Sequence, residues 1–338
     1  MKSFENRDIC IDYMRSVCMF LIVLAHVNPP NIIFQLRSFD VVGLIIISTM
    51  CMRNPCNLSE YLDALKRRIR RLVFPTFIAI SVVLIGTYFL CLMYEIPYYY
   101  DFKTIILSYT LIDGIGYIWI VRIMLIICIA SPLLFSVSKI RRGPLYGIGI
   151  SLLLFCRLVY QFLDDQGALF FFIFYFVLYS IGYIVIAEIG ILFKTNPQSF
   201  TKKTLCIALS ILAIYKIIVS LLFKESLCSF FKHPPMLDWV LYGAIVSIIL
   251  LKILYKNVDQ LKRYHISGLV IWFSKNSFNV YFMHIVVIKS ISFFADILKY
   301  PFINNWIVEY VFVLITSILF TIAFNGLKNA LKSKRLKI

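Results

Sequence analysis

Long apolar runs, without regular polar alternation, recur along this chain of 338 residues. They occupy residues 9–28, 38–52, 73–93, 117–137, 145–163, 168–192, 204–223, 237–255, 270–292 and 306–327. Most are close to the roughly 20 residues that an α-helix needs to cross a bilayer, although the second run is short. Because apolar residues continue on every face, the runs predict helices rather than the strands of a barrel. The pattern therefore predicts an all-α, polytopic membrane bundle of about ten transmembrane helices.

Composition and charge support this class. The chain is 61% hydrophobic and 15% charged, which is far from the composition of a soluble globular domain. A net charge of +17 would also suit a nucleic-acid-binding protein, but most lysines and arginines between the runs fall in alternate connections, as the positive-inside rule requires. We therefore expect a multi-pass protein of the plasma (inner) membrane with both termini in the cytoplasm and no nucleic-acid partner. Residues 1–338 are expected to form a single domain.

The first apolar run contains Asp12, Arg15 and His26, whose charged forms lipid cannot solvate. Intramembrane ionisable residues are functional candidates by default. Arg15 and His26 are eleven positions apart, so on a helix they return to nearly the same face about 16 Å apart. With the N-terminus inside, Arg15 lies nearer the cytoplasm, where a guanidinium suits a phosphate or carboxylate. His26 lies near the outer surface, where an imidazole suits proton transfer. The alternative is structural: Arg15 pairs with Asp12 one turn away, and His26 only occupies the interface.

A basic segment comes directly before the run at 73–93. It contains Lys66, Arg67, Arg68, Arg70 and Arg71, and we expect it to be a cytoplasmic loop. Such a cluster attracts a polyphosphate ligand or anionic lipid headgroups equally well. It can also serve only to set the topology.

Polar residues also occur in two later runs. Trp119 and Arg122 open the run at 117–137; the tryptophan suits an interfacial belt, and the arginine needs a partner such as Asp113, Glu309 or a ligand. His284 lies mid-span in the run at 270–292. It has either a functional role or a hydrogen bond to a neighbouring helix. The two remaining histidines, at 233 and 265, fall in predicted loops and are given no role.

Together these motifs resemble the integral membrane acyltransferases called acyltransferase type 3. That family has an Asp-x-x-Arg entry and an Arg-x10-His motif in its first helix, which Asp12, Arg15 and His26 match in type and spacing. A basic segment ending in proline follows, resembled here by residues 67–75. A Leu/Ile-Trp motif is resembled by residues 118–121.

A late Ser-x-x-x-Tyr-x-x-His motif completes the resemblance and is matched by Ser277, Tyr281 and His284. The motifs cover essentially the whole chain in order. One departure concerns the second helix, after which the family commonly has an aromatic run and Ser-Gly-Phe, whereas residues 45–50 read Ile-Ile-Ile-Ser-Thr-Met. Loss of that glycine changes how closely two helices can approach, so packing there is expected to differ.

The resemblance implies transfer of an acyl group, usually acetyl, from cytoplasmic acyl-CoA to a hydroxyl of a cell-surface or lipid-linked carbohydrate. In this reading Arg15 and the basic segment hold acetyl-CoA or another acyl-CoA, and His26 acts as general base. Arg122 or His284 stabilises the oxyanion or orients groups. No metal is expected, and the partners are membrane lipid, acyl-CoA and the glycan acceptor.

A different class of protein, a polysaccharide flippase or polymerase, is also polytopic and cationic. Polymerases tend to have a large outer loop, which is missing here, and a flippase would scatter its charges along a central cavity. A structural or regulatory membrane subunit is the third possibility. Direct transfer and a covalent acyl-enzyme are equally compatible with the sequence.

Overall fold

The structure is a computed structural model that describes residues 7–115, 118–140, 142–162, 167–227, 229–264, 266–298 and 305–335. Every regular element in these ranges is helical, as the apolar runs predict. The first residue of the predicted run at 117–137 and the last of that at 145–163 lie outside the described ranges. The chain divides into two compact units. The first contains residues 1–40 and 253–338, and the second contains residues 41–252. The prediction of a single domain stays a prediction.

Nine helical spans in the described part of the chain are long and apolar enough to cross a membrane. The first predicted run forms α1 (Ile9–Leu24), which has only 16 residues and carries the charged motif. The prediction of about ten helices therefore corresponds to nine spans that meet the length and hydropathy requirement and the shorter α1.

Two boundaries differ from the prediction. The second span begins at Asn31 instead of residue 38 and ends at Met50. It consists of α2 (Asn31–Leu36), a 3-10 turn η1 (Arg37–Phe39) and α3 (Asp40–Met50). The basic segment expected as a loop is helical, because α4 (Leu58–Met93) begins well before it. Asn57 caps α4 by accepting a hydrogen bond from the Glu60 amide, and the long charged side chains that follow are good helix formers.

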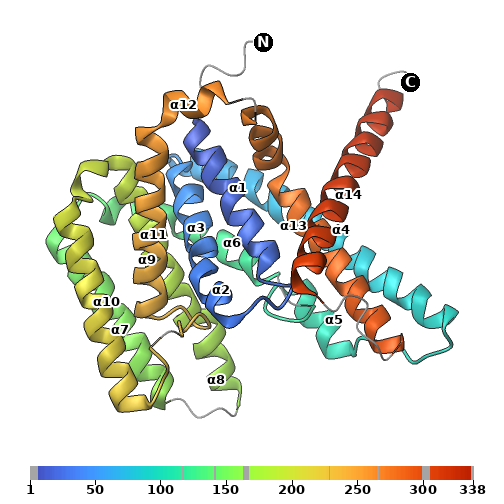
Figure 1. Ribbon diagram of the computed structural model, residues 1–338, viewed down its shortest axis with the longest axis horizontal. Helices are drawn as coiled ribbons and strands as arrows, with labels where there is room; N and C mark the ends of the chain where they lie inside the picture. The colour runs from blue at the N-terminus through green and yellow to red at the C-terminus, as the bar shows by residue number, and fades with distance from the viewer. Residues whose placement is uncertain are drawn as a thin grey trace. The chain divides into compact units, whose positions relative to one another are not determined.

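The first unit contains α1, α2 and η1, together with α12 (Val258–Arg263), α13 (Ser267–Leu298) and α14 (Trp306–Arg335). α1 packs along α13, and α13 packs along α14 (Figure 1). Between α13 and α14, Asn325 donates to Asn276 and accepts from Asn279, at 2.8 and 3.2 Å. Val23, Val287 and Val313 are among the buried residues that join α1, α13 and α14. This packing fixes the face of α1 that carries Arg15 and His26 against α13.

The second unit runs from α3 to α11. It contains α4, α5 (Phe102–Tyr109), α6 (Trp119–Val137), α7 (Arg142–Phe162), α8 (Ala168–Phe172), η2 (Ile173–Leu178), α9 (Tyr179–Thr195), η3 (Pro197–Ser199), α10 (Lys202–Phe223) and α11 (Leu237–Lys256). α8, η2 and α9 are one continuous helix in which η2 is a π-helical stretch. π-Helical turns are rare and occur frequently at functional sites. α6 packs against α9 and α4, and α7 packs against α9.

Close helix approach in the second unit depends on a glycine of α9. A Cβ added at Gly190 would lie 2.0 Å from Thr49 Oγ1 and 2.7 Å from the Ile46 carbonyl oxygen of α3. The small residue at this crossing is therefore on α9, whereas the family pattern would place a glycine after the second helix. This arrangement preserves close contact, because only one of two crossing helices needs the small side chain.

Candidate functional site

A cluster of charged and hydroxyl groups joins α1 to α13. Arg7 Nη2 donates to Asp12 Oδ1 at 2.7 Å, and Arg15 Nη1 lies 3.7 Å from the same oxygen. Ser274 of α13 bridges the pair: its hydroxyl donates to Asp12 at 2.6 Å and accepts from Arg15 at 3.0 Å. Asp12 is only 2% exposed. Two guanidinium groups thus lie at one carboxylate.

The pairing of Arg15 with Asp12, one turn away, is confirmed, whereas a functional role for Arg15 stays a prediction. The side chain of Arg15 is 22% exposed. An arginine that is held in place by a carboxylate and a hydroxyl and is partly exposed is suited to binding an anion.

The two motif histidines meet at the other end of the same helix pair. His26, just beyond the last residue of α1, stacks on His284 of α13 with ring centroids 5.5 Å apart and planes inclined by 24°. Tyr281 packs its ring edge-on against His284 at 5.1 Å. His284 is fully buried, whereas His26 is partly exposed. Of the two imidazoles, His26 is therefore the one that a substrate can reach.

A pair of stacked phenylalanine rings also joins α1 to α13. Phe20, between Arg15 and His26 on α1, stacks on Phe273 of α13 with centroids 4.4 Å apart. Arg15, Phe20 and His26 all contact α13, so the face predicted from their spacing is the face that packs.

The serine of the late motif is placed differently from Ser274. Ser277 donates its hydroxyl to the carbonyl of Ser274 at 2.9 Å, within its own helix. Ser274, which sequence reasoning did not single out, makes the contact to α1. A usable signal was present, because Ser274, Tyr281 and His284 recur near helical spacing on one face of α13. The spacing alone did not distinguish between two serines three positions apart.

In the second unit, Arg122 lies in an aromatic cluster. Its Nη1 donates to the Ile112 carbonyl at 3.1 Å, and its guanidinium carbon lies 5.5 Å from the ring centroids of Tyr175 and Tyr179. Cation–π contacts of this kind stabilise a buried arginine. Asp113, an expected partner, instead accepts from the Tyr175 hydroxyl at 3.1 Å, and Arg122 forms no ion pair within the described residues. Its Nε and Nη2 are buried and form no hydrogen bond there.

His233, to which the sequence analysis gave no role, packs within this cluster. Its Nδ1 lies 2.9 Å from the Tyr179 hydroxyl, and its ring is edge-on to Trp119 at 5.4 Å. His233 is partly accessible to solvent. Burial of its ring and, to a smaller extent, the neighbouring Lys232 charge lower the pKa of His233 to about 4. At neutral pH it is therefore an uncharged hydrogen-bonding group. The sequence contained no signal for this, because the contact depends on a loop folding back onto α6 and α9. His265 lies outside the described residues.

The basic residues of α4 form a broad cationic surface. Arg67, Arg70 and Arg71 are exposed and Arg68 is half-buried. On a helix, the positions of these residues and Lys66 cover about 200° of the circumference, while Leu72 is buried. This surface is suited to an extended anion or to lipid headgroups.

Comparison with known proteins gives one match. A family model described as an acyltransferase domain, of the type 3 class, matches residues 8–326, which include nearly all of both units. No curated protein and no solved structure matches the chain.

Proposed function

This chain belongs to the acyltransferase type 3 family of membrane acyltransferases, and we propose that it transfers an acyl group, most simply acetyl, from acyl-CoA to a hydroxyl of a carbohydrate or lipid-linked glycan. The observation that carries the proposal is the stacking of His26 on His284, because it unites two motifs that are far apart in the sequence. The same helix pair also holds Arg15 through Asp12 and Ser274.

We assign His26 as general base. Its imidazole nitrogen takes the proton of the acceptor hydroxyl while that oxygen attacks the thioester carbonyl carbon. The C–S bond then breaks, the acyl group stays on the sugar oxygen, and the proton passes to the CoA thiolate. Imidazole suits both proton transfers because its ordinary pKa is near working pH. His284, buried behind His26, is a positioning residue that sets the orientation of the His26 ring.

Positive charge supports an anionic donor. The Arg15 guanidinium and the cationic surface of α4 are each proposed to bind phosphate or carbonyl oxygens of acyl-CoA. For α4 the residues are Arg67, Arg68, Arg70 and Arg71. This proposal places the donor on the side to which the positive-inside pattern assigns the basic residues, the cytoplasm.

The aromatic cluster on α6 and α9 is proposed to bind the acceptor. Trp119 offers a ring on which the apolar face of a sugar can pack, and His233 and Asp113 offer hydrogen bonds at its edge. Arg122, buried against two tyrosines, orients this group of side chains.

The test is transfer of a radiolabelled acetyl group. Membranes containing the full chain are given acetyl-labelled CoA, and label in glycan is measured for the parent, His26→Ala and the control Ser290→Ala, whose hydroxyl donates to the Val286 carbonyl of its own helix. We expect label in glycan for the parent and the control and its loss in His26→Ala. Normal labelling in His26→Ala would refute the base assignment. Normal labelling combined with defective glycan export would favour a transporter.

A further inference from the structure

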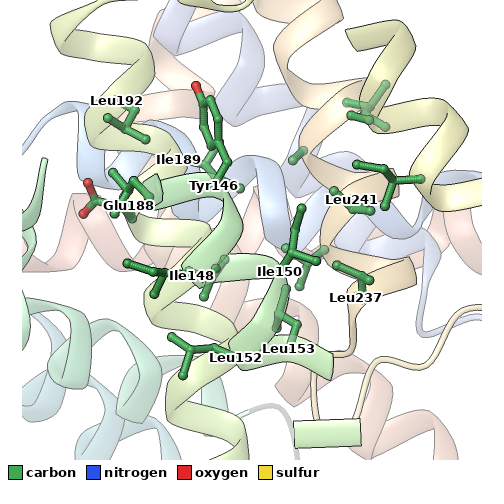
Figure 2. Close-up of a pocket in the computed structure, with 18 of the residues that line it drawn as sticks. Tyr146, Ile148, Ile150, Leu152, Leu153, Glu188, Ile189, Leu192, Leu237 and Leu241 are labelled. Carbon is green, nitrogen blue, oxygen red and sulfur yellow. The ribbon is translucent and has the colours of Figure 1, made fainter. Parts of the chain in front are cut away.

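A large cavity in the second unit is not used by the proposed reaction. It has a volume of about 360 Å³, within the range of small-molecule sites, and lies among α6, α7, α9, α10 and α11. Leu153, Ala208, Leu237 and Leu241 are among the apolar side chains that line it. Figure 2 shows the side chains of Tyr146 and Glu188 beside such apolar residues, with their oxygen atoms pointing away from the middle of the group.

These two polar residues lack partners. Glu188 is 8% exposed, and neither of its carboxyl oxygens forms a hydrogen bond within the described residues. The hydroxyl of Tyr146 is also buried without a hydrogen bond there. The third polar residue of the lining, Thr204, already donates to the Ser199 carbonyl at 3.0 Å. The surface of the cavity is almost wholly apolar, so the Glu188 carboxyl group and the Tyr146 hydroxyl lie behind it, and the cavity itself is suited to a hydrocarbon chain.

Four lysines, which we call the lysine rim, lie close along the chain to residues that line the cavity: Lys139, Lys202, Lys203 and Lys252. Lys139 follows the lining residue Val137 by two positions, and Lys202 and Lys203 directly precede the lining residue Thr204. Lys252 donates to the carbonyl of Phe200, another lining residue. Lys139, Lys202 and Lys203 are exposed and form no ion pair within the described part of the chain. The lysine rim therefore attracts an anionic group.

The order of chemistry along the cavity matches a lipid. From the lysine rim inward, positive charge is followed by an almost wholly apolar surface. An anionic glycerophospholipid presents its phosphate and then its acyl chains in that order.

We propose that this cavity binds one acyl chain of an anionic glycerophospholipid, with the phosphate at the lysine rim. The site is separate from the histidine pair, and its existence does not depend on acyl transfer. Anionic lipid is attracted to lysines at the membrane surface, and the apolar cavity binds the chain.

The first experiment is photocrosslinking of the purified full-length protein. Phosphatidylglycerol with a photoreactive group on one acyl chain is bound and activated, and the labelled peptides are mapped. We expect labels concentrated in residues 145–153, 184–192 and 204–211, with competition by unlabelled phosphatidylglycerol and much weaker competition by phosphatidylcholine. Labels spread evenly over lipid-facing helices, or equal competition by the two lipids, would overturn the proposal.

Variants test the chain and headgroup contacts separately. Ala208→Phe fills the cavity from α10, and its matched control Ala213→Phe adds the same side chain at an exposed position of that helix. We expect crosslinking to fall at least tenfold in the first variant only.

Replacing both Lys202 and Lys203 by glutamine should weaken phosphatidylglycerol binding about 30-fold in low salt, and Lys103→Gln should have no effect. Unchanged binding in the double variant contradicts the headgroup contact even if Ala208→Phe fails to fold.

Discussion

The imidazole ring of His26 stacks on that of His284, and the two residues come from motifs at opposite ends of the chain. A buried ring that packs behind a reactive imidazole restricts its rotation. Catalysis by a positioned base typically contributes a factor of 10² to 10⁴, so loss of its orientation removes part of that factor.

We therefore predict that His284→Ala lowers kcat about 10²-fold and leaves KM for acyl-CoA nearly unchanged. His284→Phe, which keeps a stacking ring, should recover part of kcat. Steady-state kinetics with labelled acetyl-CoA measure both parameters. A large rise in KM with normal kcat would instead indicate that His284 binds the donor.

The bridge through Ser274 predicts a difference between two serines of α13. Ser274→Ala removes the hydrogen bonds to Asp12 and Arg15, which are worth about 1.5 kcal/mol when charged groups take part. We expect KM for acyl-CoA to rise about tenfold. Ser277→Ala should change it less than twofold, because that hydroxyl bonds only to its own helix. A larger effect at Ser277 would contradict the assignment of Ser274 as the residue that holds Arg15.

The crossing of α3 and α9 predicts a cost in stability at Gly190. A methyl group there would overlap Thr49 and the Ile46 carbonyl, and overpacking of this kind costs about 1–3 kcal/mol. Gly190→Ala should therefore lower the Tm of the detergent-purified protein. Gly86→Ala is the control, because an added Cβ on that residue of α4 meets nothing within 4 Å. Equal Tm values for the two variants would show that α3 and α9 can move apart to accept the methyl group without loss of thermal stability.

The contact of Trp119 with His233 predicts a selective effect on the acceptor. Trp119→Ala removes the stacking surface, and an aromatic contact contributes about 0.5–1.5 kcal/mol. We expect KM for the glycan acceptor to rise about two- to tenfold, with KM for acyl-CoA unchanged. Because the pKa of His233 is about 4, the acceptor KM should not change through this residue between pH 6 and 8. If Trp119→Ala changed only the KM for acyl-CoA, this cluster would bind the acyl donor and not the acceptor.

The cationic surface of α4 predicts salt-sensitive donor binding. Arg70→Gln combined with Arg71→Gln should raise KM for acyl-CoA several-fold in low salt, since exposed charges act through a screened field. The difference from the parent should shrink as salt is added. Lys103→Gln, an exposed substitution in α5, should have no effect. If neither the double substitution nor added salt changed KM for acyl-CoA, this surface would not bind the donor, and its roles would be lipid contact and topology.

Local physics determined much of this protein from the sequence alone. Apolar runs of spanning length produce helices because lipid offers no other partner for backbone amides, and the ion pair of Asp12 with Arg15 follows from their spacing of three residues. The shared face of Arg15 and His26 is likewise a property of one helix. The helical state of the basic segment was missed, since its charges were attributed to a loop although arginine and lysine are good helix formers.

Tertiary structure decided the contacts between distant parts of the chain. Helical periodicity places a side chain on a face but does not say which face of which helix it meets, so stacking of His26 on His284 and the choice of Ser274 over Ser277 required the packing of α1 on α13. The position of His233 beside Trp119 and the cavity beside Glu188 also depend on packing, because each is formed by residues from several segments. The physical reason is that a single sequence records local periodicity directly, whereas long-range pairing depends on how all the helices fit together.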